Sequence, residues 1–465
     1  MSAQGPGVRV PAHERIVLEN GLTLILVPRR DVPLVAFNAV LRGGESNAAS
    51  GKSGVASLVA GLLEKGAGAR DAFAFADAVE GVGGTFHAGS GPESITLRGQ
   101  FLARDQHLLL ELLADVLLRP RFEPQELEYL RARQIELIKA AKDSDPSELL
   151  GTYGRAFLFG THPYGRPPIG SERSLASITH EDILRYPRAN FGADQLTLVF
   201  AGDIDSAWLT RAVSQAFASW PRAQRSASAL AQPERLRERQ VLLIDSPGSA
   251  QTYFWIGNVG VDRHYPERPA LDLVNTLFGG RFTSMLNTEL RVKSGLSYGA
   301  RSGFSRGSVA GEFAIRSFVQ TQDTPVALDL ALQTLGRLRE PQAITAEMLD
   351  SARAYLLGQF PLHFETAADW AAALGEIELF RLGAGYIDRY TPRLHEVSLP
   401  LSRSVIEQAF PVPEAVAIVL IGDAARLSDQ LAEYGPVTRM PLTQPDFQAS
   451  EAFAGGELAL ARHSA

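Results

Sequence analysis

The chain of 465 residues contains no cysteine. Disulfides, a thiol nucleophile and every thiolate-bound metal or iron–sulfur site are therefore excluded. A protein without thiols is compatible with an oxidising or a reducing environment, so this absence leaves the compartment open. The first residues, 1–7, lack the charged and apolar segments of an export signal. We expect either a cytoplasmic protein or a mature form from which a signal has been removed.

Long apolar runs and an excess of basic charge are also missing. Apolar stretches such as 22–27 and 416–421 have the length of buried strands, and none approaches the roughly 20 residues that a membrane-spanning helix needs. The formal net charge is −7, from 45 basic and 52 acidic residues, which offers no basic surface to a nucleic-acid backbone. We therefore expect no membrane span and no nucleic-acid partner.

The nine histidines do not form a recognisable metal motif. No two of them have the three- or four-residue spacing that places two side chains on one helical face. His13, His180 and His395 each precede a glutamate, but none completes the pattern H-E-x-x-H. The segment 303–307 matches the serine-hydrolase pattern G-x-S-x-G without the strand–turn–helix context that the pattern requires. We expect neither an independent zinc site nor a serine nucleophile.

The chain has the organisation of two related halves. A stretch with little apolar periodicity, 221–239, has the composition of a linker. Similar apolar segments end in Gly202-Asp203 before this stretch and in Gly422-Asp423 after it. The length also favours more than one domain. The expected parts are an N-terminal domain (1–220), a linker (221–239) and a C-terminal domain (240–465).

Each half combines strand and helix patterns that do not alternate regularly. A hairpin is expected at Asn20-Gly21, and residues 53–64, 123–142 and 347–359 have the apolar spacing of helices. Ser53 is the expected N-cap of the first of these helices. Such grouping is typical of the α+β class. We predict two homologous α/β sandwich domains, each with a mostly antiparallel sheet covered by helices.

The segment GVASLVAGLLEKG, residues 54–66, resembles the helix that carries the inverted zinc motif HxxEH in the insulinase, pitrilysin and mitochondrial-processing-peptidase family. In that motif, positions i, i+3 and i+4 share one helical face, so two histidines bind zinc and the glutamate activates water. Here these positions hold Ser57, Ala60 and Gly61. None of the three can bind zinc usefully or act as a general base.

The third zinc ligand of the family is a downstream glutamate, and its place in this sequence falls near Ala140. An alignment shifted by one helical turn would put Glu136 there, but a lone carboxylate would not restore zinc binding. Further segments share the resemblance, so that it covers nearly the whole chain: LRGGES (41–46), HPYG (162–165) and the stretch 174–205. The resemblance implies that the chain is one half of a clamshell peptidase.

The segment 279–304 resembles the part of the same family that supplies an arginine and a tyrosine to the active site. Arg291 is expected near a helix end, Gly295 as its stop, and Tyr298 at the start of the next strand. By this resemblance the tyrosine hydroxyl would donate to the oxyanion and the arginine would hold a neighbouring carbonyl. The alternative is structural: an ion-paired arginine at a helix end and a tyrosine on a strand face.

The resemblance implies a non-catalytic subunit of a heterodimeric zinc metallopeptidase. The chain itself would bind no cofactor, and a homologous partner would carry HxxEH and zinc and share peptide substrates with it. Two alternatives stay open: an inactive structural or binding homologue like the core proteins of respiratory complexes, and the partner subunit of a peptidase that trims the precursor of a cofactor such as pyrroloquinoline quinone. Similar bacterial pairs favour the periplasm over the cytoplasm.

Overall fold

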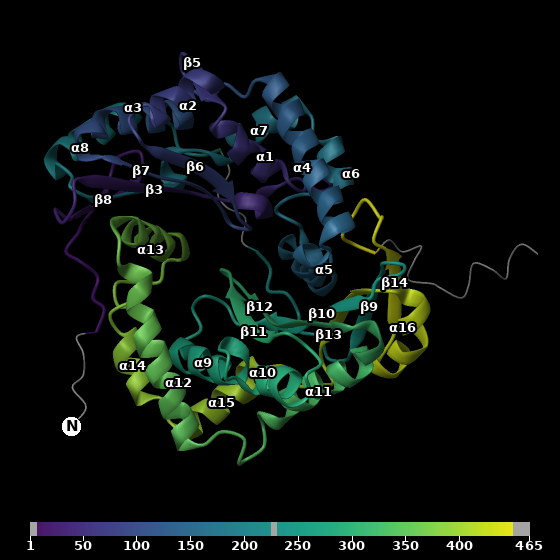
Figure 1. Ribbon diagram of the computed structural model, residues 1–465. Coiled ribbons are helices and arrows are strands. Elements are labelled where there is room, and N and C mark those ends of the chain that lie inside the picture. Colours follow the sequence, from purple (N-terminus) through teal and green to yellow (C-terminus); the bar gives the residue numbers. More distant parts are fainter. Residues whose placement is uncertain (1–6, 225–229, 450–465) are drawn as a thin grey trace, which may run out of the picture. The chain divides into compact units, whose positions relative to one another are not determined.

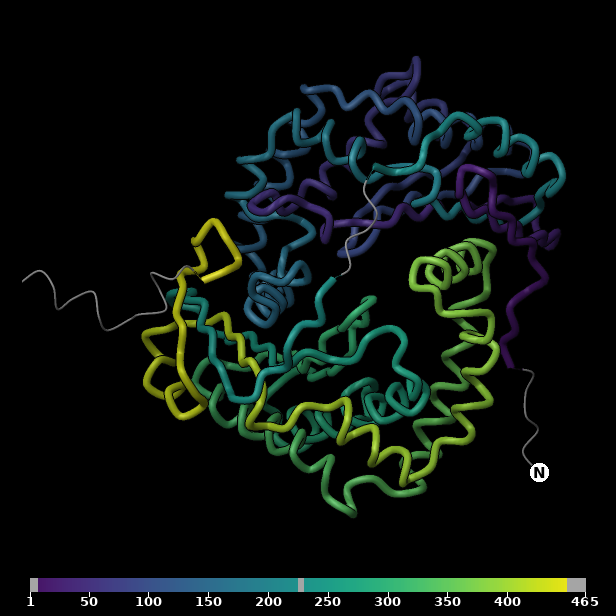
Figure 2. The backbone as a smooth tube through the Cα atoms, turned by 180° about the vertical axis from the view of Figure 1, so that it is seen from behind, coloured from purple at the N-terminus to yellow at the C-terminus, as the bar shows by residue number. Residues whose placement is uncertain are grey.

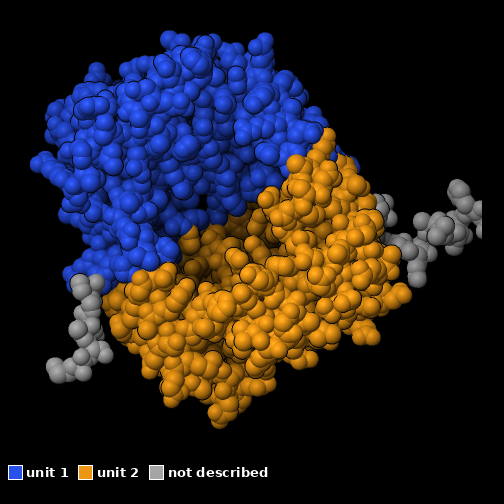
Figure 3. Space-filling model, viewed as in Figure 1, with its two compact units in different colours: residues 1–137, 166–229, 360–388 blue, residues 138–165, 230–359, 389–465 orange. Residues whose placement is uncertain are grey.

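The computed structural model describes residues 7–224 and 230–449, which form two compact units (Figure 3). Unit 1 comprises residues 1–137, 166–229 and 360–388, and unit 2 comprises 138–165, 230–359 and 389–465. Part of the expected linker, 225–229, lies outside the described residues. Across 7–224 and 230–449, no helix combines the length and apolar character that a membrane crossing needs.

Unit 1 is built on a six-stranded sheet with the strand order β1-β2-β8-β3-β7-β6. Only β2 and β8 run parallel; the other neighbours are antiparallel. The expected hairpin is present, with Glu14 of β1 opposite Leu26 of β2 and Gly21 at φ 96° in the turn between them. The strands are β1 (Glu14–Val17), β2 (Thr23–Pro28), β3 (Leu34–Arg42), β6 (Thr85–Ser90), β7 (Ser94–Leu102) and β8 (Leu196–Gly202).

Unit 2 repeats this arrangement in a second six-stranded sheet. In its order, β14-β9-β13-β10-β12-β11, the five strands from β9 to β11 match the five from β2 to β6 in place and direction. The edge strand differs, because β14 runs parallel to β9 whereas β1 runs antiparallel to β2. Strand β13, like β8, ends at the glycine of a Gly-Asp pair. The structure therefore confirms two sandwich domains with mostly antiparallel sheets. The strands are β9 (Gln240–Asp245), β10 (Gln251–Gly260), β11 (Ala300–Arg306), β12 (Gly311–Gln320), β13 (Ala417–Gly422) and β14 (Val437–Pro441).

Helices cover both sheets, and the three helices expected from apolar spacing are present (Figure 1). Unit 1 contains α1 (Val55–Leu63), α2 (Ala72–Glu80), α3 (Gln106–Leu118), α6 (Glu172–Ser177), α7 (His180–Asn190), α8 (Ser206–Phe217) and α13 (Ala367–Phe380). Unit 2 contains α5 (Ser147–Phe159), α9 (Arg268–Asn275), α10 (Met285–Asn287), α11 (Thr324–Arg337), α12 (Ala346–Gln359), α14 (Tyr390–Glu396), α15 (Leu399–Ala409) and α16 (Ala424–Leu431). Helix α4 (Pro124–Ser144) continues from one unit into the other.

The two halves of the sequence exchange one helix each. Helix α5 follows α4 in the first half of the chain but packs on β10 and β13 of unit 2. Helix α13 follows α12 in the second half but packs on β3 and β8 of unit 1, where the green helix lies beside the purple and teal strands in Figure 2. The units therefore differ from the expected division into 1–220 and 240–465, because each takes a segment from the other half.

Helix α13 closes the core on one face of the unit 1 sheet. Ala371 and Leu374 are buried against strand residues of β2 and β8, including Val27 and Val199. The buried amide of Asn38 in β3 donates to the carbonyl oxygen of Ala371 at 3.1 Å. A buried amide left without this acceptor would cost stability, so the hydrogen bond fixes where α13 sits on the sheet.

Gly375 lets α13 approach β3 closely, and we expect Gly375→Ala to destabilise the protein by about 1–3 kcal/mol. A Cβ atom there would lie 2.3 Å from Nδ2 of Asn38 and 3.0 Å from Cγ2 of Val40. The helix would have to move away and weaken the hydrogen bond to Asn38. Urea unfolding followed by circular dichroism measures the change.

The matched control is Gly358→Ala near the end of α12, where an added Cβ atom would meet nothing within 4 Å. Because alanine favours helices over glycine by up to about 1 kcal/mol, this variant should be as stable as the parent or more so. Equal effects of the two substitutions would show that the contact with Asn38 does not limit the packing of α13.

Candidate functional site

Helix α1 carries the three positions that correspond to a zinc motif. Ala60 is buried, while Ser57 and Gly61 are partly buried. Helix α4 covers this face: Gln134 Nε2 lies 3.4 Å from Oγ of Ser57, and a Cβ atom at Gly61 would lie 3.3 Å from Cδ1 of Leu130. A side chain at position 61 would have to displace the end of the Leu130 side chain.

The chain's own residues at these positions do not fit zinc, because they offer one hydroxyl and neither an imidazole nor a carboxylate. Ala140 is exposed on the part of α4 that belongs to unit 2, and Glu136 is exposed on the part in unit 1. In the part of the chain that the structure describes, no three His, Cys, Asp or Glu side chains group so as to hold a metal ion.

A buried carboxylate supports the start of α1. Glu45 is 1% exposed, and its Oε1 accepts a hydrogen bond from the backbone N–H of Gly54 at 3.1 Å. Burial raises the pKa of Glu45 to about 8, against the hydrogen bond from Gly54 and the charge of Arg166, which lower it. The expectation that Ser53 caps α1 is wrong: Gly54 occupies the N-cap at φ 93° without a side-chain hydrogen bond. A serine would strain this left-handed backbone, whereas glycine does not.

A second acidic residue stands at the other end of α1. Glu64 follows the last residue of the helix, and its side chain accepts a hydrogen bond from the backbone N–H of Ala88 in β6. Burial is the main cause that raises the pKa of Glu64. Strand β6 is at the edge of its sheet, so this carboxylate provides a hydrogen-bond acceptor for one of its N–H groups.

Arg291 and Tyr298 both lie on unit 2, and their side chains contact each other. Arg291 belongs to a π-helical segment, Thr288–Lys293, and the N–H of Gly295, at φ 67°, donates to the carbonyl oxygen of Arg291 at 3.1 Å. Tyr298 is in the loop before β11, which begins two residues later than the start expected for this strand. Short π-helical segments occur frequently at functional sites.

The pair is held by ring contacts and lies at the surface. Cζ of Arg291 is 4.6 Å from the ring centroid of Tyr298 and 4.7 Å from that of Phe282. Tyr298 is 76% exposed and Phe282 61% exposed. The neighbouring carboxylate of Glu289 is engaged by Lys293 and Arg337, at 2.9 and 3.0 Å, and the hydrogen bond from Lys293 is the main cause that lowers its pKa.

The structural alternative for the pair expects an ion-paired arginine and a tyrosine on a strand face. Among the described residues, no carboxylate forms an ion pair with Arg291, so it is not a salt-bridged arginine. Tyr298 is exposed and precedes β11, so it does not lie on a strand face. The residue before Tyr298 is well fixed, because buried Ser297 bonds through its Oγ to Oγ of Ser317 on β12 at 2.9 Å. Tyr298 is accessible to solvent, and the Arg291 guanidinium lies beside its ring.

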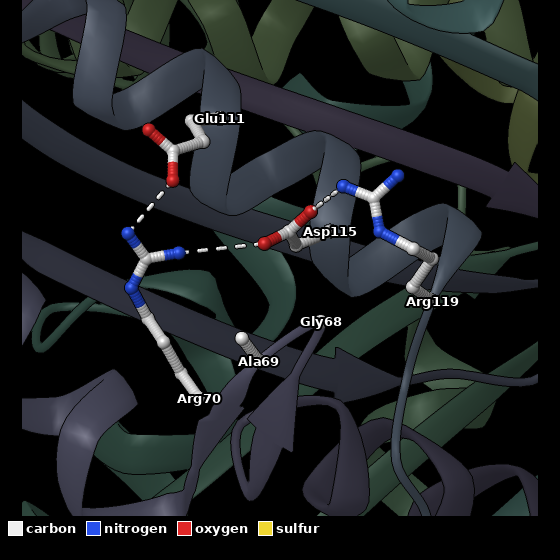
Figure 4. A pocket seen from close by; sticks show the side chains of 6 residues that line it. All are labelled: Gly68, Ala69, Arg70, Glu111, Asp115 and Arg119. Carbon is white, nitrogen blue, oxygen red and sulfur yellow. Dashed lines mark hydrogen bonds and ion pairs between the residues drawn. The ribbon is translucent and has the colours of Figure 1, made fainter.

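A pocket of about 760 Å³ in unit 1 contains none of the residues singled out from the sequence (Figure 4). Arg70 contacts Glu111 at 2.7 Å and Asp115 at 3.4 Å, and Arg119 also pairs with Asp115. The two arginines and the two acids thus satisfy one another. The cluster ties the β4–β5 hairpin (Gly66–Ala67 and Arg70–Asp71) to α3, which gives it a structural role.

Comparison with known proteins identifies the family of the chain. Residues 33–169, which include α1, match the family model of insulinase, peptidase family M16, and residues 177–356, which include Arg291 and Tyr298, match the model of the peptidase M16 inactive domain. The chain belongs to the insulinase family. As a member of that family it lacks the residues of the HxxEH motif at 57, 60 and 61.

The relatives of this insulinase-family chain include bacterial proteins of similar length. It is 26% identical to an uncharacterized zinc protease of Mycobacterium leprae, over 78% of this chain and 82% of the relative. It is 22% identical to the uncharacterized zinc protease YmxG of Bacillus subtilis, over 87% of this chain and 98% of the relative.

Solved structures share the fold. A peptidase M16 inactive domain from Pseudomonas fluorescens superposes with a TM-score of 0.82 at 23% identity, covering 89% of this chain and 98% of that one. A protease from Helicobacter pylori superposes with a TM-score of 0.81 at 19% identity, covering 88% and 99%. The insulinase fold therefore extends over nearly the whole chain.

Proposed function

We propose that the chain is the non-catalytic subunit of a two-subunit zinc peptidase, to which it contributes Arg291 and Tyr298. A homologous partner with an intact HxxEH motif would supply the metal centre and the general base. The observation that carries the proposal is the contact between the partly buried Arg291 and the exposed Tyr298, in which the arginine meets rings and, among the described residues, no carboxylate. It stands in the same chain as an α1 whose chemical positions, Ser57, Ala60 and Gly61, cannot catalyse hydrolysis.

The chemistry of the pair suits peptide hydrolysis. Attack on a peptide carbonyl builds negative charge on its oxygen, and a phenol hydroxyl such as that of Tyr298 can donate a hydrogen bond to it. The planar guanidinium of Arg291 can donate two parallel hydrogen bonds to a neighbouring carbonyl of the substrate and fix its position. Unfolded peptides are the substrate class, because both groups recognise the peptide backbone.

The test compares three samples for cleavage of a quenched fluorescent peptide: this chain, an HxxEH-bearing homologue from the same organism, and their mixture. We expect turnover only in the mixture, and its loss when a zinc chelator is added. Metal analysis by mass spectrometry should find about one zinc per catalytic partner and none above background in this chain. Activity of this chain alone would overturn the proposal, and inactivity of every sample would favour a structural or binding role.

A further inference from the structure

The aromatic ring of Phe282 lies beside the guanidinium group of Arg291. Its ring centroid lies 4.7 Å from Cζ of Arg291, as close as the ring of Tyr298 at 4.6 Å. Arg291 therefore bridges two rings that come from different segments, one before α10 and one before β11. A cation close to a ring centroid is attracted to it by the ring's quadrupole.

Phe282 does not serve the core, because 61% of its surface is exposed. A phenylalanine left this exposed gains little from burial and leaves apolar surface in water. Its contact with the Arg291 guanidinium is the ring interaction that the structure gives it. The contact with the Arg291 guanidinium is therefore the interaction by which we account for the position of the ring.

Buried Asn287 links the two segments that carry the rings of Phe282 and Tyr298. Its Nδ2 donates to the carbonyl oxygen of Phe282 at 2.7 Å, and its Oδ1 accepts from the N–H of Ala300 at 3.3 Å. Asn287 is 4% exposed, and its own N–H donates to Oγ of Ser284 at 3.4 Å. One amide therefore fixes the loop that carries Phe282 relative to the strand that follows Tyr298.

We propose that Phe282 is a positioning residue that holds the Arg291 guanidinium in place for the substrate. The inference rests on the proposed function, since the positioned group acts only if Arg291 binds a peptide. Arg291 is only partly buried, so its long side chain could adopt several rotamers, and the ring contacts restrict it before the substrate arrives. Phe282 acts through Arg291 and need not touch the substrate itself.

The kinetic test uses Phe282→Leu and Phe282→Tyr in the mixture with the catalytic partner. Phe282→Leu should lower kcat/KM by about 3- to 10-fold, mainly through a higher KM, because Arg291 binds substrate before and during the reaction. Phe282→Tyr keeps a ring and should restore most of the loss. Phe73→Leu, at an 82% exposed phenylalanine of unit 1, controls for loss of a surface ring and should behave like the parent.

A double-mutant cycle with Arg291→Ala separates the possible failures. If Phe282 acts through Arg291, then Phe282→Leu costs nothing further in the Arg291→Ala background. If Phe282→Leu lowers kcat/KM by the same factor in the Arg291→Ala background as in the parent, the positioning role is overturned. It is also overturned if Phe282→Leu leaves KM unchanged while Arg291→Ala lowers the activity. If Arg291→Ala itself has the activity of the parent, the proposed function fails and this inference fails with it.

A measurement on this chain alone does not depend on the partner. A dicarbonyl reagent that modifies guanidinium groups should react with Arg291 several-fold faster in Phe282→Leu than in Phe73→Leu, as followed by peptide mass mapping. Equal rates would contradict the contact between Phe282 and Arg291 even if the peptidase activity behaves as proposed. Circular dichroism of each variant checks that the fold is retained.

Discussion

Tyr298→Phe should reduce kcat of the two-subunit peptidase by about 10²- to 10³-fold, the usual loss when one preorganised donor to an oxyanion is removed. The substitution deletes one hydroxyl and keeps the ring that contacts Arg291. Since Tyr298 is 76% exposed, the fold does not depend on that hydroxyl. Steady-state cleavage of the fluorescent peptide by the mixture measures the change, with KM expected to move far less than kcat.

Tyr355→Phe is the matched control, because Tyr355 is also exposed on unit 2 but lies on α12, outside the segment of the pair. It should leave kcat within about twofold of the parent, as surface substitutions usually do. Full activity of Tyr298→Phe would mean that the pair is a relic. Binding of the two subunits, measured by sedimentation, should be the same for both variants.

Glu45 should make the stability of the protein fall as the pH rises from about 4.5 to about 8. Burial raises its pKa to about 8 from an ordinary value of 4.5, so folding favours the protonated carboxyl. Its contribution is fully present below pH 4.5 and is lost as the pH approaches 8, with a slope of up to about 1.4 kcal/mol per pH unit. Glu45→Gln, which stays neutral, should therefore be more stable than the parent near pH 8 by a few kcal/mol.

Urea unfolding of the whole protein at several pH values measures this difference in stability. Glu19→Gln, at an exposed position, removes one negative charge from the same unit without touching α1 and serves as the control. The parent and Glu45→Gln should converge at acid pH and diverge above neutrality. Parallel profiles at all pH values would show that Glu45 is not forced to ionise inside the folded protein.

Local pattern was enough to predict most of the elements. The Asn20-Gly21 turn signal predicted the β1–β2 hairpin, and the apolar spacing of 53–64 predicted α1. The paired Gly-Asp sites at 202 and 422 correctly indicated two related sheets. The exchange of α5 and α13 was not predictable in this way, because an amphipathic helix shows which of its faces is apolar but not which sheet will receive it.

The part of the site that lies within one short segment, Arg291 and Tyr298, could be identified from the sequence. Arg291 lies in the π-helical segment Thr288–Lys293, and a short turn after this segment brings Tyr298 into contact with it. Phe282 was missed since nothing in its local pattern distinguishes an exposed phenylalanine near an arginine from a buried one. Glu45 was noticed only as part of a glycine-rich motif, because its burial depends on chain segments far away in the sequence.

The exchanged helices impose an order on synthesis of the chain. Every strand of the first sheet has been made by residue 202, whereas α13, which covers one face of that sheet, begins at residue 367. At 5–20 residues per second, the ribosome leaves this apolar face without its cover for roughly ten to thirty seconds. A fragment that stops at the end of the first half keeps that face exposed permanently. We therefore expect the nascent chain to need a chaperone, and the two halves to be soluble only when they are made together.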